Sequence, residues 1–165
     1  MTDAIVDAGP LIHLAELDAL AVLNDFALLY ITNAVWDEVA KHQPKALSSA
    51  MLHLEHTAAP APSAELRTLA QGLVLDRGEI ESLALMESHP LALFLTDDAA
   101  ARLAAEQRGY RVHGTLGLLV RSVRKDLISK QNALQLIRSI PQRSTLHIRQ
   151  NLLDEVIQLL EHEWN

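Results

Sequence analysis

The residues Leu91-Ala-Leu-Phe-Leu-Thr96 form the clearest strand pattern of the chain, and the acids Asp97 and Asp98 follow directly. An apolar run of this length is typical of a strand that is covered on both faces of a sheet. Asp98 is placed to cap a helix over Ala99–Arg108, which Gly109 ends. This stretch therefore predicts a buried strand that leads straight into a helix, the unit of parallel α/β sheets.

Strand and helix patterns alternate on both sides of this stretch. Short apolar segments predict further strands over Ala4–Asp7, Ala27–Thr32 and Tyr110–His113, and Thr57–Ser63 is either a connection or an edge strand. Periodicity and capping residues predict helices over Pro10–Leu17, Leu20–Phe26, Ala34–His42, Ala46–His56, Ala64–Gln71, Arg77–Ser88, Leu116–Ile128, Lys130–Ile140 and Ile148–His162. We therefore expect a three-layer α/β/α fold with a mostly parallel central sheet and extra C-terminal helices.

The composition excludes several classes of protein. The 165 residues suit one compact domain, and the 49% of hydrophobic residues exclude a disordered tail. The absence of cysteine excludes disulfides, thiolate zinc sites and a cysteine nucleophile. No apolar run approaches the ~20 residues of a membrane helix, and the first residues lack the basic region of a signal peptide. We therefore expect a cytoplasmic protein without a membrane partner.

Basic residues are concentrated between Ala99 and Arg149, which we call the basic segment. It holds ten Lys and Arg against two acids, whereas the rest of the chain holds four against nineteen, for a net charge of −7. This contrast indicates an anionic partner. If the partner is RNA, the candidate phosphate contacts are Arg102, Arg121, Arg124 and Lys125. Alternatively, the segment forms ordinary helix faces whose charges pair with acids elsewhere.

Acidic residues fall where the ends of the predicted parallel strands meet. They follow the strands or open the neighbouring helices, and they are Asp7, Glu38, Glu79, Glu81, Asp97 and Asp98. Each alone is explained as a helix cap or a first-turn acid. Together they repel one another, so their grouping favours a bound cation. Oxygen ligands favour Mg²⁺ or Mn²⁺ over zinc, and the matching chemistry is metal-assisted hydrolysis of a phosphodiester.

Five short motifs follow one another in order along the chain. They are Val6-Asp-Ala-Gly-Pro-Leu-Ile12, Val35-Trp-Asp-Glu-Val39, Gly78-Glu-Ile-Glu-Ser-Leu-Ala-Leu85, Leu95-Thr-Asp-Asp-Ala-Ala-Ala-Arg102 and Gly114-Thr-Leu-Gly117. At this spacing they resemble the PIN-domain nucleases, and more narrowly a prokaryotic PIN-like group related to VapC-type toxins. The resemblance spans roughly Ile5–Ile128. It implies Mg²⁺- or Mn²⁺-dependent ribonuclease activity, and often a small antitoxin protein encoded alongside.

The resemblance also implies roles for individual acids. Asp7 matches the first acid of the family and Glu38 the second. The third is normally an Asp, and here Glu79 or Glu81 stands in its place, with one methylene more of reach. The fourth falls at Asp97 or Asp98. The catalytic set that follows is Asp7, Glu38, Glu79 and Asp97, with Glu81 and Asp98 as further candidate metal ligands.

The resemblance leaves the end of the chain and two other functions open. The helices after residue 130 have no counterpart in the minimal family pattern, so we expect a PIN-like domain over residues 1–129 and a helical extension over 130–165 packed on it. A catalytically silent PIN-like binding module is the main alternative, favoured by the Glu at the third position. A phosphoacceptor receiver is a weaker one, because His113-Gly-Thr115 stands where receivers need a lysine.

The last predicted helix carries a broad apolar face. Its apolar residues are Leu152, Leu153, Val156, Ile157, Leu159 and Leu160, with Trp164 beyond them. Such a face must be buried against its own domain, a second subunit or a partner protein. We expect a homodimer.

Overall fold

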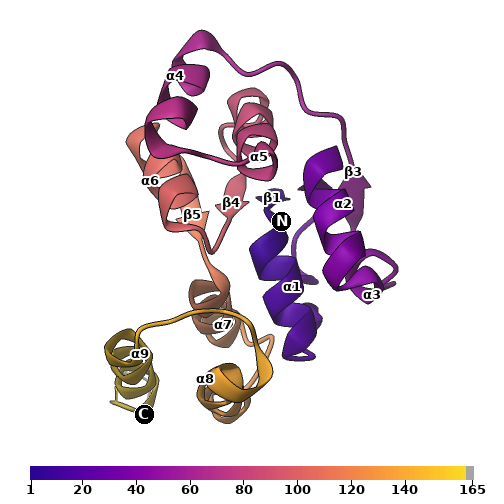
Figure 1. Cartoon of the computed structure of the whole chain (residues 1–165). Helices are drawn as coiled ribbons and strands as arrows, with labels where there is room; N and C mark the ends of the chain where they lie inside the picture. Colours follow the sequence, from indigo (N-terminus) through magenta and orange to yellow (C-terminus); the bar gives the residue numbers. More distant parts are fainter. Residues whose placement is uncertain (163–165) are drawn as a thin grey trace.

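The computed structural model describes residues 1–162, and within them five short strands form one parallel sheet. In spatial order these strands are β3 (Leu54–His56), β2 (Leu29–Ile31), β1 (Ala4–Val6), β4 (Leu93–Leu95) and β5 (Arg111–His113) (Figure 1). Val6 of β1 pairs with Leu95 of β4, so the residues that follow these two central strands lie side by side. All four pairings are parallel, and every strand therefore ends at the same edge.

Helices connect the strands and cover both faces of the sheet (Figure 1). In chain order they are α1 (Ala8–Glu16), the 3₁₀ helix η1 (Leu20–Leu23), α2 (Asn33–His42), α3 (Pro44–Leu47), α4 (Ala64–Leu73), α5 (Arg77–Ser88), α6 (Ala99–Gln107), α7 (Thr115–Arg124), α8 (Lys130–Arg143) and α9 (Gln150–His162). None of these helices, which lie in residues 1–162, has the length and apolar character needed to cross a membrane.

Alternate residues of the central strands bury opposite faces of the sheet. Ile5 and Phe94 are fully buried in a core shared with α4, α5 and α6. Val6 and Leu95 point the other way, into a larger core shared with α1, α2 and α7. This alternation follows from the two-residue period of a strand. The three-layer α/β/α fold with a parallel sheet is therefore confirmed.

Helices α8 and α9 extend the larger of the two cores. Ala133, Ile137 and Ile140 of α8 and Leu160 of α9 are buried in the same apolar cluster as α1 and α7. The face of α9 predicted to be apolar is only partly covered, because Leu152 remains 47% exposed. Trp164, which was placed beyond this face, lies outside the described residues.

The prediction of a helix over Ala46–His56 is wrong. The chain forms only the short helix α3 there, and then the edge strand β3, whose backbone pairs with β2. Glu55 and His56 are exposed at this edge, so the apolar pattern that identifies a strand is missing. The segment Leu20–Phe26, also predicted helical, forms only the 3₁₀ turn η1.

Candidate active site

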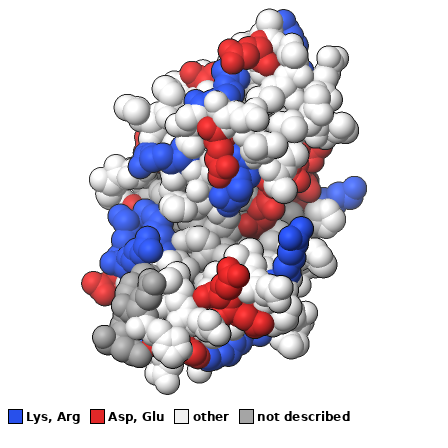
Figure 2. All heavy atoms as spheres, turned by 90° about the vertical axis from the view of Figure 1, so that its left-hand side faces the viewer, with Lys and Arg blue, Asp and Glu red and all other residues white. Residues whose placement is uncertain are grey.

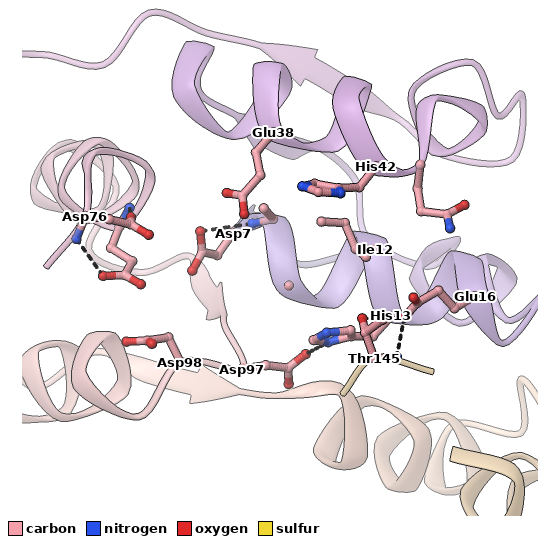
Figure 3. A pocket seen from close by; sticks show the side chains of 14 residues that line it. Asp7, Ile12, His13, Glu16, Glu38, His42, Asp76, Asp97, Asp98 and Thr145 are labelled. Carbon is pink, nitrogen blue, oxygen red and sulfur yellow. Dashed lines mark hydrogen bonds and ion pairs between the residues drawn. The ribbon is translucent and has the colours of Figure 1, made fainter. Parts of the chain in front are cut away.

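A cavity of about 530 Å³ lies at the edge where the parallel strands end. Seven carboxylates line it, and they come from α1, α2 and α5 or from residues next to these helices and to β1 and β4: Asp7, Glu16, Glu38, Asp76, Glu79, Asp97 and Asp98. Two histidines, His13 and His42, also line it. Figure 3 shows Asp7 and Glu38 pointing toward one another and Asp97 turned toward His13. The parallel order of the strands therefore brings most of the predicted acids into one cavity.

Asp7 is the most buried acid of the cavity, with 7% of its surface exposed. Its side chain caps α1 by accepting a hydrogen bond from the Ala8 amide at 2.9 Å, and its other oxygen accepts one from the Thr96 hydroxyl at 2.9 Å. Burial raises its pKa to about 7, against these two hydrogen bonds, and the charges of Asp76 and Glu38 add to the rise. Ionised Asp7 is therefore costly to the fold in the absence of a cation.

Glu79 is held at the start of α5 by a capping box. The Asp76 side chain accepts from the Glu79 amide, and the Glu79 side chain accepts from the Asp76 amide, both at 2.9 Å. Burial raises the pKa of Glu79 to about 7, with contributions from the charges of Asp76, Asp98 and Asp7. Asp76 was not among the predicted site residues, although the spacing Asp76-x-x-Glu79 before an apolar helix is the sequence signal for this box.

Glu81, the alternative to Glu79 as the third acid, does not line the cavity and binds other partners. Its Oε1 accepts a hydrogen bond from the Ala34 amide at the start of α2, at 3.0 Å. Its Oε2 pairs with Arg77 of the same helix at 2.8 Å. Since Glu81 lies two residues after Glu79 on α5, it points to another side of the helix.

Asp97 and Asp98 line the cavity in different ways. Both oxygens of Asp97 accept hydrogen bonds, Oδ1 from the Thr115 amide at 2.6 Å, and Oδ2 from the Thr115 hydroxyl at 2.6 Å and His13 Nδ1 at 2.7 Å. Asp98 caps α6 with Oδ2, which accepts from the Ala101 amide at 2.8 Å. The charge of Asp98 also contributes to the raised pKa of Glu79. Asp98 thus has an oxygen left for a ligand, whereas Asp97 is occupied by its neighbours.

Glu38 and His42 approach the cavity from α2. Val35 and Val39 are buried on the core side of this helix, so Glu38 and His42, one turn apart, lie on its exposed side.

Gly114 allows the start of α7 to approach the end of β4 closely. A Cβ atom there would lie 2.8 Å from Asp97 Oδ1 and 3.1 Å from both the Thr96 carbonyl oxygen and the guanidinium of Arg102. The guanidinium of Arg102 therefore lies near Asp97 and the start of α7.

The donor chemistry of the cavity fits a hard divalent cation, because its carboxylates offer only oxygen. However, within residues 1–162 no three Asp, Glu or His side chains converge closely enough to form a complete metal site by themselves. Mg²⁺ commonly takes only one or two carboxylates from a protein and completes its shell with water and substrate phosphates. The residues present therefore fit a cation of this kind that binds weakly until substrate joins it.

Several side chains of the basic segment pair with acids from other parts of the chain. Arg121 makes two hydrogen bonds of 2.9 Å to Asp25, and its guanidinium lies 4.3 Å from the centre of the Phe26 ring. Arg108 pairs with Glu87 at 2.7 Å. On the face seen in Figure 2, basic and acidic side chains lie among one another. Of the predicted phosphate contacts, Arg121 is thus part of the scaffold, whereas Lys125 (51% exposed) and Arg102 (40% exposed) are accessible.

Comparison with known families identifies the class of protein. A family model for the PIN domain matches residues 3–162, and the chain therefore belongs to the PIN-domain family. The match includes α8 and α9, so it extends beyond the stretch on which the sequence motifs lie. Comparison with curated proteins and with solved structures gave no significant match. PIN domains are in general nucleases, typically dependent on divalent metal ions.

Proposed function

We propose that this chain is an Mg²⁺- or Mn²⁺-dependent ribonuclease that hydrolyses RNA phosphodiesters. The observation that carries the proposal is the cavity itself, which seven carboxylates line while the ion pair of Asp97 with His13 is the only one that they form within residues 1–162. Burial raises the pKa of Asp7 and Glu79 to about 7. Such an arrangement destabilises the fold unless a cation joins it, which is the expected signature of a metal-dependent site.

The proposed ligands are drawn from Asp7, Glu38, Glu79 and Asp98. When bound there, a divalent cation would polarise the attacking water and offset charge at the scissile phosphate. Thr96 holds the Asp7 carboxylate in place, and the capping box holds Glu79, so these side chains are oriented before substrate arrives. We assign Asp97 a supporting position in place of direct metal contact, because it has three hydrogen-bond partners, His13 among them, whereas each oxygen of Asp7 accepts only one hydrogen bond.

RNA is the proposed polymer, and its backbone would be held by the accessible part of the basic segment. Arg102 lies close to Gly114 and Asp97 at the start of α7, and Lys125 lies exposed at the end of α7. Arg124 is the remaining candidate phosphate contact. Aromatic residues make up only 4% of the chain, so phosphate contacts rather than base stacking would supply the affinity.

A role as the toxin of a toxin–antitoxin pair also belongs to this proposal. The partners would be a small antitoxin protein and a second copy of the chain. The half-covered apolar side of α9, with Leu152 exposed and Val156 and Ile157 partly buried, supports a protein contact there. Light scattering of the full chain checks the homodimer, since a monomer at micromolar concentration would contradict it.

The deciding experiment is a nuclease assay on mixed single-stranded and structured RNAs with Mg²⁺, Mn²⁺ or EDTA, run beside Asp7→Asn. We expect cleavage with either metal by the wild type alone, and none in EDTA. The second candidate, a catalytically silent PIN-like binding module, is favoured by the lack of three converging ligands within residues 1–162. RNA binding without cleavage under all metal conditions would support it and overturn the proposal.

A further inference from the structure

His13 is the histidine of the cavity that has a carboxylate partner. It lies on α1, where Gly9, Ile12, His13 and Glu16 share the side facing the cavity while Leu11 and Leu14 are buried in the core. Its Nδ1 lies 2.7 Å from Asp97 Oδ2, and only 14% of its side chain is exposed. The other histidine of the cavity, His42, has no hydrogen-bond or ion-pair partner within residues 1–162. Only His13 is therefore fixed in one orientation.

Asp97 is itself held from the other side. The Thr115 amide donates to its Oδ1 and the Thr115 hydroxyl to its Oδ2, both at 2.6 Å. An ionised carboxylate only accepts hydrogen bonds, so we assign the proton between the two side chains to Nδ1 of His13. The second ring nitrogen, Nε2, has no hydrogen-bond partner among residues 1–162. The result is a chain Thr115–Asp97–His13 with one unengaged nitrogen on a ring that lines the cavity.

From this geometry we infer that His13 is the proton donor to the leaving oxygen of the scissile phosphodiester, and that Asp97 and Thr115 are the residues that position it. The inference rests on the proposed ribonuclease function. Asp97 keeps the tautomer and ring orientation of His13 and compensates its positive charge, as a carboxylate does for a catalytic histidine. This role explains why Asp97 is turned away from the other carboxylates and toward α1 (Figure 3).

The proposed step is balanced. Water forms a new P–O bond and releases one proton to solvent, while the P–O bond to the leaving ribose oxygen breaks. That oxygen takes the proton from Nε2 of His13, and the ring regains one from bulk water. The electron pair of the broken bond remains on the leaving oxygen, so no oxidant or other co-reactant is needed.

The alternative is that His13 only fastens α1 to β4 and α7. His13→Asn separates the two, because the Asn amide nitrogen can occupy the place of Nδ1 and donate to Asp97, while Nε2 is lost. His42→Asn is the matched control in the same cavity. We expect His13→Asn to keep the wild-type melting temperature and RNA affinity in EDTA, and to lose about 10²–10⁴-fold in the cleavage rate with Mg²⁺. His42→Asn, at a cavity histidine without a carboxylate partner among residues 1–162, should lose far less of the cleavage rate than His13→Asn.

The readout specific to proton donation is a substrate in which sulfur replaces the leaving bridging oxygen. A thiolate leaves without a proton, so His13→Asn should cleave this substrate within about tenfold of the wild-type rate. Asp7→Asn should remain inactive on it, because its defect lies elsewhere. Because the leaving side is unknown, substrates with sulfur at the 3′ or at the 5′ bridging position are both used.

The outcomes are distinct. If His13→Asn cleaves ordinary RNA at the wild-type rate, or if sulfur fails to restore its activity, His13 is not the proton donor and the ribonuclease proposal still stands. If His13→Asn melts well below wild type, Asp97→Asn and Thr115→Val are tested with the same sulfur substrates, and failure of rescue there overturns the inference. If the wild type cleaves neither kind of substrate, the proposed function fails and the role of His13 fails with it.

Discussion

The carboxylates of the cavity and the arginines of the basic segment differ in what surrounds them. Arg121, Arg108 and Arg143 each lie against an acid that is far away in the chain, namely Asp25, Glu87 and Asp18. Asp7 and Glu79 instead lie among other acids, and burial raises the pKa of both. Paired charges can be explained by stability alone, whereas like charges that share a cavity cannot. The acidic cavity, more than the basic segment, therefore marks the functional part of the molecule.

The largest effect is expected from Asp7→Asn. Asn can still accept from the Ala8 amide and meet the Thr96 hydroxyl, while the buried charge disappears. At pH 8 in EDTA the variant should be more stable than wild type by a few kcal/mol, since each pKa unit corresponds to about 1.4 kcal/mol. With Mn²⁺, the wild type alone should gain stability, and cleavage by the variant should fall by more than about a hundredfold.

Melting curves of both proteins with Mn²⁺ or EDTA check this prediction, and Asp37→Asn on the exposed side of α2 is a control outside the cavity. An Asp7→Asn variant that melts lower than wild type in EDTA would show that Asp7 is only a helix cap. A capping role predicts a loss of about 1 kcal/mol and no dependence on metal.

The second prediction concerns pH. Asp7 and Glu79 ionise near pH 7 in the folded chain but near their ordinary values of 3.8 and 4.5 when unfolded. Between these limits the folded state binds more protons, so the free energy of unfolding should fall as the pH rises from about 4 to 7 and level off above. Urea titrations in EDTA measure this slope. In the double variant Asp7→Asn, Glu79→Gln the slope should largely vanish, and a slope unchanged by these substitutions would contradict the raised pKa values.

On the basic side, Arg121→Ala should destabilise the fold without weakening RNA binding. The substitution leaves Asp25 without its two hydrogen bonds and removes the contact with Phe26, so we expect a loss of about 2–3 kcal/mol in the free energy of unfolding. Asp25 has a lowered pKa, because the Arg121 hydrogen bonds and charge outweigh the opposing effect of burial. This stabilisation should therefore be lost as the pH falls below about 4. Lys125 also pairs with Asp25, at 3.5 Å, but its side chain is 51% exposed. Lys125→Ala should therefore lower the free energy of unfolding by less than about 1 kcal/mol.

The smallest effect is expected for RNA affinity. In EDTA, the double variant Arg102→Ala, Lys125→Ala should bind RNA more weakly, and the slope of log affinity against log salt should fall by about 0.7 for each phosphate contact removed from a single strand. Fluorescence anisotropy between low and moderate salt measures both quantities. If Arg121→Ala lowers this slope as much as the double variant does, the division of the basic segment into scaffold and accessible residues is wrong.

Local patterns in the sequence predict the layers of the fold and the edge at which the acids meet. The apolar run Leu91–Thr96 and the capping residues Asp7, Asp76 and Asp98 are local signals, and local signals need only a few neighbouring residues to take effect. The parallel sheet follows from the alternation of strands and helices. Of the five strands within residues 1–162, β3 was the one not predicted, because its pairing with β2 depends on the backbone and leaves Glu55 and His56 exposed.

The direction of each charged side chain, in contrast, depends on contacts between elements that are distant in the chain. Glu79 and Glu81 differ because two positions on a helix face different neighbours, and Asp97 differs from Asp98 because His13 and Thr115 reach it from other elements. Arg121 meets Asp25 across 96 positions of the chain. These contacts join residues that are distant in sequence, so no local pattern encodes them. They exist only once packing has brought the helices together, and they separate the charges of the cavity from those of the scaffold.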